Sequence, residues 1–162
     1  QTVSFTTRSI RLGEVDGYDY HFISKETFID KRNKNEFIEC QSVYENYYGT
    51  SYNSIDRILK SGKDVILEID YKGMLAIKSK IPKAKSIYII PPSIEELEKR
   101  LIDRGLDSTS VIHKRVSQAE DELNYVKFAD FTVVNDNFSQ ACQSLKSLIL
   151  LAKLEFYDSI KH

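Results

Sequence analysis

The chain has 162 residues, 41% of them hydrophobic and 29% charged, with a formal net charge of −1. These values predict one globular domain with a substantial core. The near-zero charge argues against a nucleic-acid surface, and no apolar run is long enough to cross a membrane. Cys40 and Cys142 lie far apart without metal-ligand spacing. We therefore expect no disulfide framework and a cytoplasmic location.

The first half of the chain predicts short strands and capped helices. Strands are expected over residues 2–5, 20–23 and 37–44, where apolar and β-branched or aromatic residues recur. Helices are expected over residues 24–35, with Ser24 as the cap, and over residues 51–60, ended by Gly62.

The second half alternates apolar strands with helices. Buried strands are predicted over residues 64–70, 86–90 and 131–134, and helices over 72–79, 94–103, from Ser108 onward, and 139–156. Ser93 and Glu96 form a candidate capping box. This alternation predicts an α/β fold with a parallel sheet covered by helices on both faces, into which a strand-rich segment is inserted. Ligands of such folds bind at the carboxyl ends of strands.

Arg8 and Arg11 stand three residues apart among hydroxyl side chains and the turn glycines Gly13 and Gly17. Guanidinium forks suit phosphate oxygens, so the pair predicts a site for a phosphorylated small molecule. The alternative is a pair of solvated surface arginines.

Aromatic and acidic residues form two further candidate groups. Tyr20, Tyr47 and Tyr48, beside an expected Gly49-Thr50 turn, could donate to phosphate, or could be core aromatics. The carboxylates of Glu39, Glu68 and Asp70 could accept from the N–H groups of a guanine edge, and one could hold hydrated magnesium. For Asp70 the alternative is a helix cap or a turn residue.

Arg100, Arg104 and Arg115 form the last candidate group. Arg100 and Arg104 share a helix face, and Arg115 follows on the next helix after Gly105. Arginines that close over transferring phosphates neutralise developing charge. The alternative is a solvated charged face.

Taken together, these segments resemble the guanylate kinase family, whose members transfer a phosphoryl group from ATP to GMP. The resemblance runs along nearly the whole chain. It is carried, in order, by Thr6-Thr7-Arg8 with Arg11, Gly13-Glu14-Val15-Asp16-Gly17, Asp19-Tyr20, Tyr47-Tyr48-Gly49-Thr50, Glu68-Ile69-Asp70 with Gly73, Pro91-Pro92-Ser93, Arg104-Gly105 and Val133-Val134-Asn135-Asp136.

The resemblance implies a role for each matching position. The GMP-binding residues would be Ser4, Arg8, Arg11, Tyr20, Glu39, Tyr48, Thr50, Glu68 and Asp70. The catalytic residues would be Arg8, Arg100, Arg104 and Arg115, and the ATP-binding residues Arg100, Arg104 and Asn135. Mg²⁺ would enter with ATP, with Asp70 reaching it through water. One domain, 1–162, would contain a GMP-binding region over 18–50, a lid with flanking helices over 93–125, and a core.

The sequence departs from the family pattern at single positions. Ile10 stands where proline is usual, Lys72 where glutamine is usual, and Glu68 where aspartate is common.

The larger departure concerns the phosphate loop. The 162 residues contain no Gly-x-x-x-x-Gly-Lys-Ser/Thr motif. We expect the natural protein to carry a strand-loop-helix unit, on the order of 30 residues, upstream of Gln1, or to gain it by complementation. Without that unit we expect negligible turnover. A non-catalytic guanylate-kinase-like interaction module is the alternative function, and an RNA-binding or other phosphate-handling protein is a third.

Overall fold

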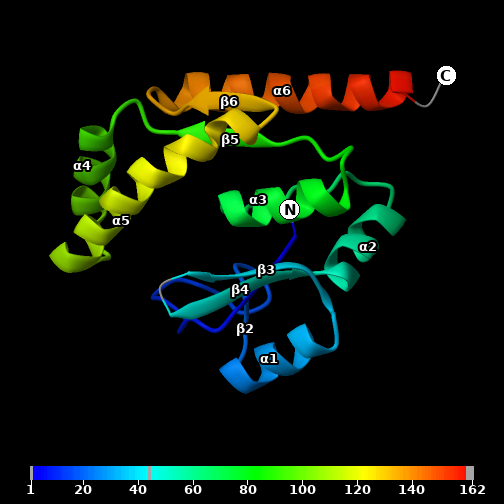
Figure 1. The fold of residues 1–162 in the computed structure, drawn as a ribbon, viewed down its shortest axis with the longest axis horizontal. Helices are drawn as coiled ribbons and strands as arrows, with labels where there is room; N and C mark the ends of the chain where they lie inside the picture. Colours follow the sequence, from blue (N-terminus) through cyan, green and yellow to red (C-terminus); the bar gives the residue numbers. More distant parts are fainter. Residues whose placement is uncertain (1, 44, 160–162) are drawn as a thin grey trace. The chain divides into compact units, whose positions relative to one another are not determined.

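A computed structural model describes residues 2–43 and 45–159 of the chain, with side chains described as far as residue 154. The chain forms two compact units, Gln1–Pro82 and Lys83–His162. Figure 1 shows the elements of both. The single domain over 1–162 stays a prediction.

The first unit is built on a mixed four-stranded sheet with the order β2-β1-β4-β3. β1 (Phe5–Thr6) runs parallel to β2 (His21–Phe22) and antiparallel to β4 (Asn46–Ser51). β4 also pairs antiparallel with β3 (Phe37–Val43), with a register irregularity between Phe37 and Glu39. The strands predicted over 20–23 and 37–44 are therefore present as β2 and β3, and the strand predicted over 2–5 lies at Phe5–Thr6. Tyr44 lies outside the described residues.

An aromatic stack supports one face of this sheet. Phe28, on α1 (Lys25–Asn33), is fully buried, and its ring stacks on Phe37 at 4.6 Å and on Tyr47 at 5.4 Å between centroids. A Cβ at Gly49 would come within 3.1 Å of the Phe28 ring and of the Cys40 Cβ. Glycine at that position therefore lets the helix approach the sheet closely.

Three helix N-termini of the first unit are capped by the side chains that precede them. Ser24 accepts from the Thr27 N–H at the start of α1, as predicted. Ser51 caps α2 (Tyr52–Lys60), and Asp70 caps α3 (Tyr71–Lys80). Each cap satisfies a backbone donor that has no partner within the helix.

The second unit pairs β5 (Ile87–Ile90) with β6 (Phe131–Val134) in parallel. Its helices are α4 (Ile94–Arg104), α5 (Thr109–Glu122), the 3₁₀ turn η1 (Leu123–Phe128) and α6 (Phe138–Ser159). α4 packs on α5, and α6 packs on β6. Ser93 caps α4 through the Glu96 N–H, so the predicted helix start is confirmed.

Two expectations about strands were wrong. Residues 46–51, taken as a Gly49-Thr50 turn, form β4, because the hairpin partner β3 supplies its hydrogen bonds. Residues 64–70 form no strand, and Ile66 is 49% exposed. A strand requires a ladder partner, and the hydrogen bond from the Thr2 N–H to the Ile66 carbonyl does not by itself make a ladder. The parallel pairing predicted for the apolar strands is present between β5 and β6.

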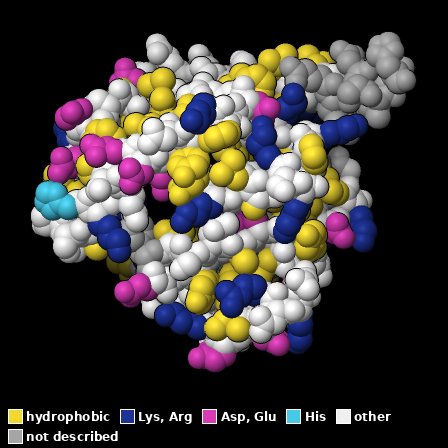
Figure 2. Space-filling view, in the orientation of Figure 1, with side chains coloured by type: hydrophobic (Ala, Val, Ile, Leu, Met, Phe, Trp, Pro, Cys, Tyr) yellow, Lys and Arg dark blue, Asp and Glu magenta, His cyan; other side chains and the backbone are white. Residues whose placement is uncertain are grey.

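No helix within the described ranges is long and apolar enough to cross a membrane. On the face shown in Figure 2, Lys and Arg side chains are scattered rather than gathered in one stripe.

We expect Phe28→Ala to destabilise the protein by about 3–5 kcal/mol, because it empties the centre of the aromatic stack. Leu12→Ala, at a fully exposed position of the same unit, should change stability by less than about 0.5 kcal/mol. Urea denaturation of both variants measures the difference, and similar losses in the two would contradict the packing described here.

Candidate active site

A hollow of about 460 Å³ opens in the first unit beside the loop that contains Gly13 and Gly17. Ser4, Tyr20 and Glu68, three of the predicted GMP-binding residues, line it. Other lining residues are Thr2, Val3, Glu14, Tyr18 and Asp19. The Thr2 hydroxyl is buried with no hydrogen-bond partner in the described part of the chain.

Arg8 is held in this region by a bidentate ion pair with Glu14. Its Nη2 donates to Glu14 Oε1 at 2.7 Å and its Nη1 to Oε2 at 3.0 Å. The Arg8 side chain is only 13% exposed, so the alternative of a solvated arginine is wrong for this residue. The hydrogen bond to Glu14 raises the pKa of Arg8, against the opposing effect of burial.

Glu14 connects the two predicted phosphate ligands. Its Oε2 also accepts from the Arg11 backbone N–H at 2.7 Å, so one carboxylate holds the Arg8 side chain and the Arg11 backbone. Hydrogen bonds from Arg8 and then from Arg11 lower the pKa of Glu14 to about 2. Our sequence reasoning placed Glu14 in a motif but gave it no role. A carboxylate three residues after Arg11, beside a turn glycine, was the available signal.

Two tyrosines complete this cluster. The rings of Tyr20 and Tyr48 meet edge to face at 6.0 Å, and the Arg8 guanidinium lies 5.6 Å from the Tyr20 ring centre. Burial raises the pKa of Tyr20, so its hydroxyl stays protonated and able to donate. The structure therefore brings together Arg8, Tyr20 and Tyr48, as predicted, and adds Glu14 to them.

A second cluster joins Ser4, Thr50 and Glu39 in one hydrogen-bond chain. Thr50 Oγ1 donates to Glu39 Oε1 at 2.6 Å, and Ser4 Oγ lies 3.2 Å from Thr50 Oγ1. Because a hydroxyl has one proton and Thr50 gives it to Glu39, Ser4 is the donor of the other bond. Thr50 and Glu39 are buried, and burial raises the pKa of Glu39 although the Thr50 bond opposes this.

Asp70 lies next to Glu39 and acts as a helix cap. Its Oδ1 accepts from the Gly73 N–H at 2.8 Å. A Cβ at Gly73 would lie 3.3 Å from Glu39 Oε2 and 3.4 Å from Asp70 Oδ1, so both carboxylates converge on this glycine. The cap that was left open as an alternative for Asp70 is present. No three His, Cys, Asp or Glu side chains within the described ranges are grouped to hold a metal ion directly.

In the second unit, Arg100 binds the chain directly after β6. Its Nη1 donates to the Asn135 carbonyl at 2.7 Å and its Nη2 to the Asp136 carbonyl at 3.3 Å, while its Nε bonds Glu96. Arg100 and Asn135, both predicted to bind ATP, are therefore neighbours.

Arg104 and Arg115 meet at Asp107, which our sequence reasoning did not single out. Arg104 Nη2 donates to Asp107 Oδ2 at 2.7 Å, and Arg115 Nη1 lies 3.6 Å from the same oxygen. The predicted pair is thus brought together by an acidic residue on the connection between α4 and α5.

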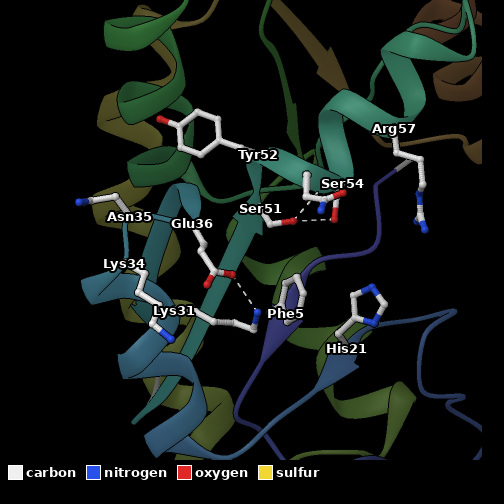
Figure 3. A pocket seen from close by; sticks show the side chains of 11 residues that line it. Phe5, His21, Lys31, Lys34, Asn35, Glu36, Ser51, Tyr52, Ser54 and Arg57 are labelled. Atoms are coloured by element: carbon white, nitrogen blue, oxygen red, sulfur yellow. Dashed lines mark hydrogen bonds and ion pairs between the residues drawn. The ribbon is translucent and has the colours of Figure 1, made fainter.

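Figure 3 shows a second hollow of the first unit, of about 480 Å³. It lies beside Phe5 and His21, the neighbours in sequence of Ser4 and Tyr20, and successive strand residues face opposite sides of a sheet. Its lysines are paired internally, Lys31 with Glu36 at 2.9 Å and Lys34 with Asp30 at 2.8 Å. We therefore take the hollow lined by Ser4, Tyr20 and Glu68, next to the Arg8–Glu14 pair, as the candidate active site.

Comparison with known proteins places these observations in a family. The family model described as guanylate kinase matches residues 1–152. A guanylate kinase of Vibrio cholerae is 47% identical over 154 residues, which cover 95% of this chain and 74% of the relative. One of Buchnera aphidicola subsp. Schizaphis graminum is 44% identical over 162 residues, covering 99% and 78%. The crystal structure of guanylate kinase from Anaplasma phagocytophilum superposes with a TM-score of 0.80 at 28% identity, covering 93% of this chain and 73% of that one.

The α/β fold and these relatives define a nucleotide-binding transferase. The chain belongs to the guanylate kinase family. It spans about three quarters of the length of the relatives named above. The family resemblance seen in the sequence is confirmed.

The Glu14–Arg8 pair should make folding stability depend on pH. The folded-state pKa of Glu14 is about 2 against an ordinary 4.5, so the unfolded chain binds more protons between these values. The stabilisation is present above pH 4.5 and is lost as the pH falls toward 2. We expect melting temperatures of Glu14→Gln to fall less than those of the unsubstituted protein across this window.

Asp56→Asn, which removes one negative charge from an exposed position of α2, is the matched control for that pH series. Its curve should follow that of the unsubstituted protein. Parallel curves for all three proteins would show that the Glu14–Arg8 pair does not contribute to the pH dependence of folding stability.

Proposed function

We propose that this protein is a guanylate kinase that transfers the terminal phosphoryl group of ATP to GMP, giving GDP and ADP. The observation that carries the proposal is the position of two clusters in one unit. Arg8, Tyr20 and Tyr48 form a donor cluster suited to a phosphate, and Ser4, Thr50 and Glu39 form a polar chain suited to a purine edge.

The phosphate of GMP would bind at the first cluster. Arg8 presents a planar fork that matches two phosphate oxygens, and Arg11 supplies a second guanidinium. In the structure the fork is occupied by Glu14, whose carboxylate is similar in shape to one edge of a phosphate. The hydroxyls of Tyr20 and Tyr48 would add neutral donors. A dianionic phosphate would thus find cations and hydroxyls already gathered.

The guanine base would be recognised by the second cluster. Guanine presents two adjacent donors, its N1–H and its amino group, which a carboxylate accepts. Glu39 is the buried carboxylate held in place by Thr50, and Glu68 lines the hollow beside Ser4. Adenine offers an acceptor where guanine has N1–H, so the same carboxylate would reject AMP.

In the transfer, an oxygen of the GMP phosphate attacks the terminal phosphorus of ATP. A new O–P bond forms, the bond from that phosphorus to the bridging oxygen breaks, and ADP leaves with its electron pair. Arg100, Arg104 and Arg115 would neutralise the charge that develops on the transferred group, and Asn135 would lie near the adenine. Catalysis would rest on positioning and electrostatics, without a covalent intermediate.

Magnesium would enter as part of the ATP substrate, as is typical of the family. The described residues do not form a direct ligand set for the metal ion. Asp70, whose Oδ1 already caps α3, is proposed to contact metal-bound water only.

The absence of a phosphate-loop motif from these 162 residues affects the activity that we expect of them alone. Because they contain no Gly-x-x-x-x-Gly-Lys-Ser/Thr motif, we propose that a polypeptide of these residues alone binds GMP but turns over negligibly. We also propose a cytoplasmic location.

Arg8→Ala should weaken GMP binding by about 10- to 100-fold, the loss of one charge-assisted interaction of 1.5–3 kcal/mol. Arg57→Ala removes an exposed arginine of α2 elsewhere in the unit and should leave binding unchanged. Calorimetry with GMP measures both, and a coupled ADP-release assay on the full-length protein tests turnover. GMP binding without turnover in that protein would favour the interaction-module alternative, and no binding would refute the proposal.

Glu39→Gln should reduce the preference for GMP over IMP, which lacks the amino group, by about tenfold, because the amide offers one acceptor instead of two. The folded state raises the pKa of Glu39, so the carboxylate costs stability as the pH rises above 4.5, and Glu39→Gln removes that cost. The variant should therefore melt at the same temperature or higher at neutral pH. An unchanged GMP-to-IMP preference in this folded variant would remove Glu39 from base recognition.

A further inference from the structure

Asp107 has the environment of a residue that holds two other side chains in place. It lies between Gly105, which ends α4 in the left-handed conformation at φ 65°, and Ser108, which precedes α5. Its side chain is only 7% exposed, although it carries a charge. A buried carboxylate is stable only when it is paired, and here two guanidinium groups are directed at one of its oxygens.

Those two guanidinium groups come from different helices. Arg104 is the last residue of α4 and Arg115 lies within α5, and their nitrogens lie 2.7 Å and 3.6 Å from Asp107 Oδ2. Two like charges repel at such short range unless an opposite charge lies between them. Asp107 therefore both neutralises the repulsion and sets the spacing of the two arginines.

The three side chains differ in how exposed they are. The Arg104 side chain is 42% exposed and that of Arg115 26%, whereas the Asp107 side chain is only 7% exposed. An incoming anion would meet the arginines first and would not touch Asp107. The Arg104 guanidinium has five N–H donors, so its bond to one carboxylate oxygen leaves donors for a polyphosphate.

We propose that Asp107 is a positioning residue that makes Arg104 and Arg115 act as one unit toward the phosphates of ATP. The inference rests on the proposed function, since it assigns a use to both arginines in phosphoryl transfer. Asp107 itself would contact neither substrate. Its effect on the rate would pass entirely through the two arginines.

The first test is steady-state kinetics of Asp107→Asn in the full-length protein. We expect kcat to fall about 10- to 100-fold and KM for ATP to rise, while KM for GMP changes less than twofold, because the GMP site is built from other residues. Asp107→Glu, which keeps the charge one methylene farther out, should recover part of kcat. Asp103→Asn, the same charge change on the exposed surface of α4, is the matched control and should behave like the unsubstituted enzyme.

The second test asks whether Asp107 acts through the arginines. In an Arg104→Ala/Arg115→Ala background, Asp107→Asn should cause no further loss of kcat. A further loss as large as in the unsubstituted enzyme would overturn the proposal. Unchanged kinetics of Asp107→Asn alone would also overturn it.

A stability measurement separates this inference from the proposed function. If the full-length protein shows no GMP-dependent ADP release, the proposed function fails. The contact of Asp107 with Arg104 and Arg115 is then tested by melting temperatures. The drop caused by Asp107→Asn should then shrink by at least half in the Arg104→Ala/Arg115→Ala background. Equal drops in both backgrounds would show that Asp107 does not hold the arginines.

Discussion

The candidate site in the first unit depends on the cross-strand register of β3 and β4. That register places Glu39 opposite Thr50, and the hydrogen bond between their side chains joins the two strands within the site. A slip of one residue in either strand would turn that strand's side chain to the other face of the sheet and break the pair. The register irregularity between Phe37 and Glu39 lets Phe37 pack into the aromatic stack while Glu39 faces Thr50. Packing on one face and polar contacts on the other are thus set by the same pairing.

Carboxylates hold the arginines of both units in place. Glu14 holds Arg8, Glu96 bonds Arg100, and Asp107 lies between Arg104 and Arg115. A long flexible side chain loses rotamer freedom when it is held, and that cost is met here before a ligand arrives. An arriving phosphate then competes with a carboxylate for donors that are already placed. Holding the arginines in this way fixes where a phosphate binds more than it increases the affinity for the phosphate.

Local signals in the sequence predicted the helices well. Ser24, Ser51 and Ser93 each precede a helix and each accepts a backbone N–H, because capping depends only on residues within one turn. Strands were less predictable. Gly49 and Thr50, within β4, were taken for a turn because they resemble turn residues. Residues 64–70 were taken for a strand because of the apolar run Val65-Ile66-Leu67 and Ile69. In both cases the outcome depended on whether a pairing partner was present, which the local residue types do not show.

The sequence by itself determined the family, the helix starts and the residue types of both ligand clusters, because these reside in local order and spacing. Only the tertiary structure decided which charges pair. Glu14 with Arg8, and Asp107 with two arginines, are contacts set by chain path and burial, which no motif encodes. It also decided that Thr50 gives its single proton to Glu39 and so makes Ser4 a donor, since the direction of a hydrogen bond follows from all the neighbours of a hydroxyl together.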